Sequence, residues 1–138
     1  MKVVRYCLCL LAIAATSLLG AGLPSETLRG KIQIHEGKPA VVETAGHKLV
    51  ALDGDESTRK ILNDVRLNGF QVEAKGRFTA AGTFLIDPIH TRALLVRQDG
   101  RLKMITYFCE VCNIRSYTPG NCVCCQRETT LDLRDPDQ

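Results

Sequence analysis

The sequence has no tryptophan and few other aromatic residues, with three Tyr and four Phe among its 138 residues. Large aromatic platforms that stack nucleotide bases are therefore not expected. No Gly-x-Ser-x-Gly motif, glycine-rich phosphate loop or His-Glu-x-x-His motif occurs. The chain is also too short for a dinucleotide-binding fold or an α/β barrel. We expect no catalytic and no cofactor-binding residues, and we predict that the protein is not an enzyme.

The chain also lacks a strong excess of either charge. Its 18 basic and 15 acidic residues give a formal net charge of +3, which is too small to indicate a nucleic-acid-binding protein. With 45% hydrophobic and 24% charged residues, the composition is typical of a small globular domain.

No apolar run reaches the roughly 20 residues that a membrane-spanning helix needs. The chain begins with a basic stretch, continues with an apolar run over residues 6–20 and then has the small residues Ala21 and Gly22. This layout predicts a secretory signal peptide over residues 1–22; an uncleaved anchor is the alternative. We therefore expect an exported protein, periplasmic or secreted, with no stable membrane insertion after cleavage.

Alternating apolar and polar residues predict strands over much of residues 27–92. Between the third and fourth of these strands the period changes, and Ile61, Leu62 and Val65 share a helical face. Asp55 or Ser57 is positioned to cap the start of this helix. The predicted order is three strands, one short helix, and two strands, the last of which continues to Ile89.

This element order resembles the OB fold, a small five-stranded Greek-key barrel; an unrelated meander of strands with one helix is the alternative. We predict a mainly β protein with an OB-like barrel whose core includes Phe70 and Phe84. OB folds bind oligonucleotides, oligosaccharides or proteins through one sheet face. The balanced charges on the predicted strand faces argue against nucleic acid. The expected ligand is an unknown protein or glycan.

Residues 93–133 are predicted to form a β-hairpin, turned by Asp99-Gly100, that leads into a cysteine cluster. Cys109, Cys112, Cys122 and Cys125 have the spacing C-x2-C-x9-C-x2-C. Two residues between cysteines allow a tight turn to direct both sulfurs at one ion, as in structural tetrahedral zinc sites.

The cluster resembles a zinc ribbon, and this resemblance implies that the four cysteines bind structural zinc. It departs from the ribbon pattern in two ways. Asn113 and Gln126 stand where a glycine commonly follows each cysteine pair. Cys124 is an additional thiol that is an alternate ligand in place of Cys122 or Cys125.

Other uses of the cysteines stay open. In an oxidising compartment they can form at most two disulfides with one thiol left over. A redox-active C-x2-C is a further alternative, although such motifs normally open a helix.

We expect surface positions for the other polar residues that could act in a site. His35, His47 and His90 are expected on the surface or in loops. Arg115 and Tyr117 are candidate partner contacts, although solvent-facing positions are the simpler expectation.

The whole plan, which ends in a polar tail over residues 134–138, resembles uncharacterised exported bacterial proteins. The sequence favours an exported non-catalytic binding or scaffold module with a structural four-cysteine zinc site. The alternative is an envelope metal-handling or thiol-redox protein that uses the cysteine cluster.

Overall fold

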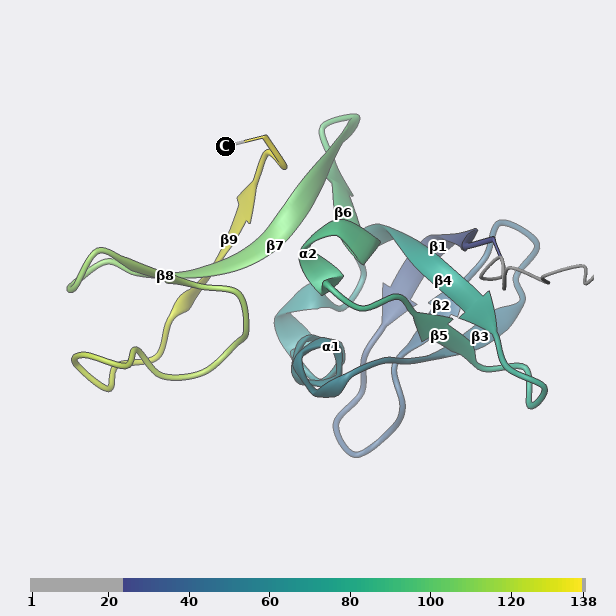
Figure 1. Cartoon of the computed structure of the whole chain (residues 1–138), viewed down its shortest axis with the longest axis horizontal. Helices are drawn as coiled ribbons and strands as arrows, with labels where there is room; N and C mark the ends of the chain where they lie inside the picture. The colour runs from purple at the N-terminus through teal and green to yellow at the C-terminus, as the bar shows by residue number, and fades with distance from the viewer. Residues whose placement is uncertain (1–23, 138) are drawn as a thin grey trace, which may run out of the picture.

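The computed structural model describes residues 24–137, so the predicted signal peptide lies outside the described residues. The described part forms a barrel at one end and a strand-and-loop extension at the other (Figure 1). Its elements, in chain order, are β1 (Glu26–Gln33), β2 (Val41–Glu43), β3 (Leu49–Asp53), α1 (Glu56–Leu62), the 3₁₀ helix η1 (Val65–Leu67), β4 (Gln71–Phe78), β5 (Phe84–Ile86), α2 (His90–Ala93), β6 (Leu94–Gln98), β7 (Arg101–Cys109), β8 (Ile114–Ser116) and β9 (Thr130–Arg134).

The first five strands close into a barrel. β1 pairs antiparallel with both β2 and β4, and β2 pairs antiparallel with β3. β3 then pairs parallel with β5, and β5 pairs antiparallel with β4, which completes the ring. Because α1 lies between β3 and β4 in the chain, the element order is the predicted one, and the mainly β, OB-like barrel is confirmed.

Barrel closure depends on a close approach at Gly30 in β1. Gly30 pairs with Val72 of β4, and the next residue, Lys31, pairs with both Gln71 of β4 and Glu43 of β2. A Cβ atom at Gly30 would lie 2.2 Å from the Glu43 carbonyl oxygen. Only glycine allows β1 to pass between its two neighbours at this distance.

The helical region differs from the prediction at its C-terminal end. The Asp55 carboxylate accepts a hydrogen bond from the Thr58 backbone N–H at 2.8 Å, which confirms Asp55 as the cap of α1. Val65, however, is 56% exposed and does not share the face of α1. The helix ends earlier because the Asp64 carboxylate starts a separate 3₁₀ turn, and Leu67 of that turn fills the core instead.

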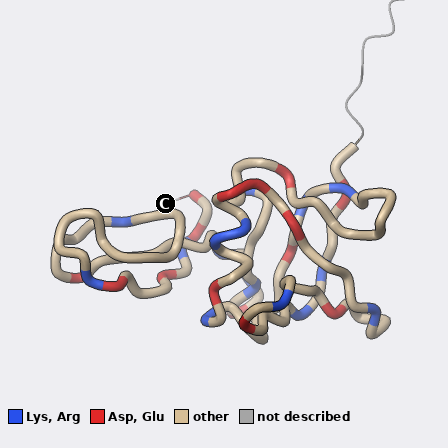
Figure 2. Tube along the Cα trace, turned by 90° about the horizontal axis from the view of Figure 1, so that it is seen from below, with Lys and Arg blue, Asp and Glu red and all other residues tan. Residues whose placement is uncertain are grey.

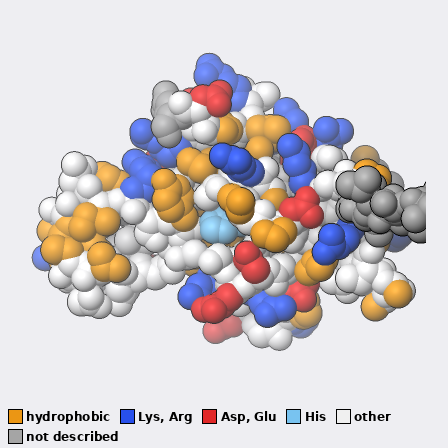
Figure 3. Space-filling model, in the orientation of Figure 1, with side chains coloured by type: hydrophobic (Ala, Val, Ile, Leu, Met, Phe, Trp, Pro, Cys, Tyr) orange, Lys and Arg blue, Asp and Glu red, His pale blue; other side chains and the backbone are white. Residues whose placement is uncertain are grey.

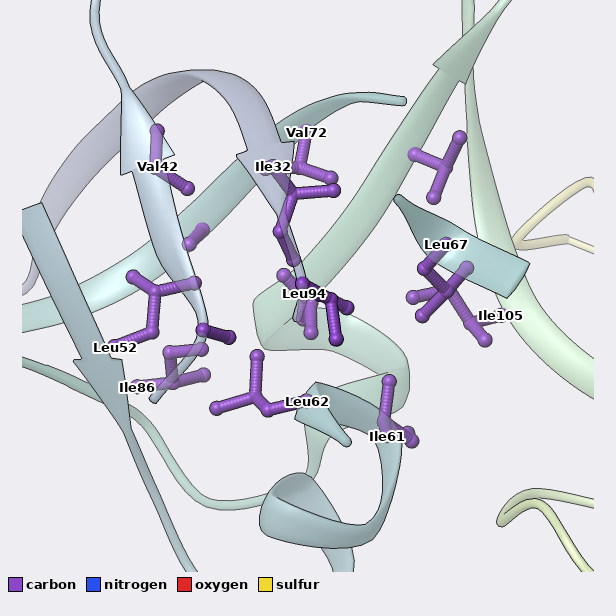
Figure 4. Close-up of a cluster of buried hydrophobic side chains, with 14 of the residues drawn as sticks. Ile32, Val42, Leu52, Ile61, Leu62, Leu67, Val72, Ile86, Leu94 and Ile105 are labelled. Carbon is purple, nitrogen blue, oxygen red and sulfur yellow. The ribbon is translucent and has the colours of Figure 1, made fainter. Parts of the chain in front are cut away.

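One hydrophobic core fills the barrel and continues toward the extension (Figure 4). Strands β1 to β7 and all three helical segments contribute buried side chains to it. Phe84 is fully buried and Phe70 packs against the cluster half-buried, as predicted. No cysteine of residues 24–137 belongs to this core, so the barrel does not need the cysteines to pack.

The sheet continues from the barrel into the extension. β6 pairs with β4, and a tight turn at Asp99 and Gly100, both with positive φ, confirms the predicted hairpin of β6 and β7. β7 then carries β8 and β9, both antiparallel to it. The predicted polar tail overlaps β9 at Arg134, and its next residue, Asp135, forms an ion pair with Lys103 at 2.7 Å.

The short helix α2 was not predicted. The strand expected to reach Ile89 ends at Ile86, and Ile89 precedes α2 with φ 67° and ψ 65°. This left-handed conformation costs a β-branched residue about 1–2 kcal/mol. Within residues 24–137, no helix has the length and apolar character that a membrane crossing requires.

Candidate metal centre

The structure brings the four predicted cysteine ligands together at the far end of the extension (Figure 1). Cys109 ends β7, and Cys112 lies in the turn between β7 and β8. Cys122 and Cys125 come from the long connection between β8 and β9. The four Sγ atoms all lie within 4.8 Å of one another, and those of Cys109 and Cys125 are 3.5 Å apart.

These distances suit a tetrahedral ion. With zinc–sulfur bonds of about 2.3 Å, the sulfurs of a tetrahedral site are about 3.8 Å apart. The five cysteines of residues 24–137 are free thiols, and four of them are close enough together to hold one metal ion. Four protein ligands fill a tetrahedral ion and leave no position for a substrate or water. An ion held in this way would contribute to the stability of the fold.

Both cysteine pairs form the same tight turn. Asn113 and Gln126, the residues that replace the expected glycines, have φ values of 55° and 59°. This is the left-handed conformation that a glycine at each position would supply, and asparagine is one of the residues that tolerate it best. The substitutions therefore change the residue types but not the backbone shape of the two turns.

Backbone N–H groups converge on one sulfur of each pair. The N–H groups of Cys125 and Cys124 point to the Cys122 sulfur and lower its pKa to about 7. The N–H of Cys112 likewise favours the thiolate of Cys109, but burial and the thiols of Cys125 and Cys122 outweigh it and raise the Cys109 pKa. The thiols of Cys124 and Cys125 raise the pKa of Cys112. Crowded thiols ionise together only when a cation compensates their charge.

Cys124 lies outside the four-sulfur cluster. Its residue is exposed, whereas Cys109 and Cys122 are each only 3% exposed. Its side chain is nevertheless close enough to influence the Cys112 thiol. Cys124 is thus a free thiol beside the cluster, and the structure favours the set with Cys122 and Cys125 over one in which Cys124 replaces either.

Hydrogen bonds within the long connection hold the second cysteine pair in place. The Cys122 N–H donates to the Arg127 carbonyl at 2.7 Å, and the Gln126 N–H donates to the Cys122 carbonyl at 3.0 Å. The Thr129 hydroxyl donates to the Gly120 carbonyl at 2.7 Å. These bonds fix the backbone that carries the buried Cys122 side chain.

Arg66 joins the barrel to the extension. Its guanidinium donates to the Thr129 carbonyl at 2.7 Å and lies 5.1 Å from the centre of the Tyr107 ring. The Asp64 carboxylate accepts a hydrogen bond from Arg66 at 2.8 Å. Burial, with the Asp64 carboxylate beside it, raises the pKa of Tyr107, so this phenol stays protonated.

Asp64 makes this junction sensitive to acid. Burial alone would raise its pKa, but hydrogen bonds from the Arg66 side chain and N–H outweigh burial and lower it. A lowered pKa in the folded state gives stability that is present above the unfolded pKa of about 3.9 and is lost as pH falls further.

We expect Asp64→Asn to lower the free energy of unfolding by about 1–3 kcal/mol at pH 7. This difference should shrink at pH 3, as measured by urea unfolding at both pH values. Asp137→Asn is the exposed control, and an equal difference at both pH values would contradict the role of Asp64.

Two residues that were expected to face solvent are instead structural. Arg115 donates to the Thr106 hydroxyl at 2.8 Å, pairs with the Asp132 carboxylate, and lies 5.0 Å from the centre of the Phe108 ring. His90 is 7% exposed, and its Nε2 lies 2.8 Å from the Tyr117 carbonyl oxygen. Sequence spacing gave no signal for either contact.

Comparisons of this chain with protein-family models, curated proteins and solved structures found no match. The assignment of the centre therefore rests on its geometry alone.

Proposed function

We propose that the four-cysteine cluster binds one structural zinc ion and that the protein is an exported, non-catalytic binding or scaffold module. The observation that carries the metal assignment is the mutual distance of the four sulfurs, all within 4.8 Å. A donor set of thiolates alone, without carboxylates, suits zinc better than magnesium or calcium. The basic, apolar and small-residue order of the first 22 residues supports export.

The binding role is supported by the barrel. OB-like barrels commonly present one sheet face to a ligand, and we expect a protein or glycan there. Acidic and basic residues are interspersed along the chain (Figure 2), which supports a partner other than nucleic acid.

The test is a metal and thiol analysis of the chain purified from an exporting host. Native mass spectrometry should give one zinc per chain, and denaturing mass spectrometry should give the mass of the reduced thiols. A zinc-free protein about 4 Da below the reduced mass would mean two disulfides and would refute the metal site. Iron or copper in the purified protein would refute zinc as the ion.

The exposed free thiol of Cys124, which influences the Cys112 thiol, favours a second candidate, a thiol-redox function of these two cysteines. In this function a peroxide oxidises the two thiols. A sulfur–sulfur bond forms while the O–O bond breaks, and the peroxide takes up two electrons and two protons to become water. Zinc is released because Cys112 no longer supplies a thiolate.

Cys124→Ser tests this second candidate. After addition of hydrogen peroxide, the variant is expected to release zinc several-fold more slowly than the unmodified chain, because the exposed thiol that starts the oxidation is gone. Release is followed with a chromogenic zinc indicator. Val123→Ser, at the neighbouring exposed position, is the control. Equal release from the Cys124→Ser chain and the unmodified chain would refute the thiol-redox function, and only the structural role would remain.

A further inference from the structure

A groove of about 700 Å³ lies between the barrel and the extension, on residues that the metal centre does not use. Leu95 of β6 and Met104 of β7 line it from the sheet, and Ile89 and Tyr117 line it from the loops. Figure 3 shows hydrophobic side chains gathered over this part of the molecule, with lysine and arginine near them. The volume lies within the range of small-molecule sites.

The backbone at Ile89 is strained, and the strain does not serve core packing. With φ at 67°, Ile89 keeps a left-handed conformation, yet its side chain is 60% exposed. Its carbonyl accepts hydrogen bonds from the N–H groups of Arg92 and Ala93, which fix the turn at the start of α2. Strained residues that gain no burial are concentrated at binding sites. The isoleucine side chain contributes an apolar surface to the groove.

The two sides of the groove are tied together by a buried polar contact. His90 follows Ile89, and its Nε2–H donates to the Tyr117 carbonyl at 2.8 Å. This bond connects α2 with the segment after β8, across 27 residues of sequence. The apolar surfaces of Ile89 and Tyr117 are thereby held at a fixed separation before any ligand binds.

The groove also carries two exposed cations without a partner. Lys75 of β4 and Arg92 of α2 line it, and neither forms an ion pair with a carboxylate of residues 24–137. Two carboxylates next to the groove have partners of their own. Asp135, which precedes Pro136 in the groove lining, pairs with Lys103 at 2.7 Å, and Asp87 accepts a hydrogen bond from Ser25. The cations are therefore available to an anion.

From the apolar lining, the strained Ile89 and the two unpaired cations, we propose that this groove binds a small amphiphilic anion. The ligand has an apolar chain against Ile89, Leu95 and Met104, and one anionic head between Lys75 and Arg92. This assignment goes beyond the protein or glycan proposed for the barrel face and names a small ligand for a separate groove. Among the lining residues, only Tyr117 belongs to the segment that carries the cysteine cluster.

The test is isothermal titration of the purified full chain with decanoate. We expect a dissociation constant of about 10–500 µM. Lys75→Gln combined with Arg92→Gln should weaken binding about tenfold, because charge-assisted contacts to the head are lost. Ile89→Asn should weaken binding while the chain keeps or raises its urea midpoint, since asparagine tolerates a positive φ.

The control is Lys38→Gln combined with Lys48→Gln, which removes two exposed charges away from the groove and should leave the affinity unchanged. No binding of decanoate, or equal affinity in the groove variants and the control, would overturn the proposal. Equal affinity for decanol, which has no charge, would overturn the assignment of an anionic head to the ligand. Zinc content is measured on the same samples, so failure of the metal site and failure of the groove are scored separately.

Discussion

A chain in which Cys109 is replaced by serine is expected to bind no zinc and to lose the fold of residues 110–129 while the barrel stays folded. Cys109 is 3% exposed and ends β7, and its sulfur is 3.5 Å from that of Cys125. A serine hydroxyl does not replace a thiolate as a zinc ligand at neutral pH. The metal content should fall from about one ion per chain to near zero.

Hydrogen bonds from Arg66 and His90 reach this segment, but apolar packing contributes little to it. Val111 and Val123, the apolar residues within its two cysteine turns, are 60% and 82% exposed. β8 contains only three residues, and no residue between 110 and 129 belongs to the hydrophobic core. The binding free energy of a structural zinc ion is about 10 kcal/mol or more, and the proposed zinc would therefore be the main stabilisation of this segment. The barrel has its own core and keeps its structure.

Two measurements check this result. Metal analysis gives the zinc content, and amide hydrogen exchange separates residues 110–129 from the barrel strands. Cys124→Ser is the matched control, since it removes a neighbouring thiol from outside the cluster and should keep both zinc and protection. A Cys109→Ser chain with a full zinc content, or with unchanged protection in the segment, would show that Cys109 is not a ligand.

The barrel could be predicted from the sequence because apolar and polar residues alternate along its strands and because local turn residues separate these strands. Besides α2, two elements were missed for identifiable causes. The Asp64 carboxylate accepts a hydrogen bond from the Arg66 N–H, and α1 therefore ends before Val65. The helical periodicity of the sequence, which continues through Val65, does not reveal this end. Strand β9 does carry a period of two, with Leu131 and Leu133 half-buried, but it is short and its partner β7 precedes it by more than twenty residues.

The cysteine cluster was predicted from spacing alone, since two residues between cysteines dictate a turn of one kind. Spacing did not show that Asn113 and Gln126 would adopt the glycine-like conformation, because that depends on the hydrogen bonds of the folded turns. The contact of His90 with Tyr117 joins residues 27 positions apart and leaves no local pattern. Long-range polar contacts of this kind require the fold before they can be found.

Gly30→Ala is expected to destabilise the barrel by about 2–4 kcal/mol or to prevent its folding. The added Cβ would lie 2.2 Å from the Glu43 carbonyl oxygen and 2.7 Å from a methyl carbon of Val42. Both neighbours belong to β2, and the nearest atom is backbone, so no side-chain rotation relieves the contact. β2 must move away from β1, and this movement breaks the pairing of Lys31 with Glu43 on which closure depends.

Urea unfolding followed by far-ultraviolet circular dichroism measures this loss. Gly46→Ala is the matched control, because nothing lies within 4 Å of a Cβ at Gly46 in the turn between β2 and β3. That variant should stay within about 0.5 kcal/mol of the unmodified chain. If Gly30→Ala were equally mild, β1 and β2 would have to be farther apart in solution, and the barrel would be open along this edge. The Gly30→Ala change thus tests closure of the ring at the pairing of β1 with β2.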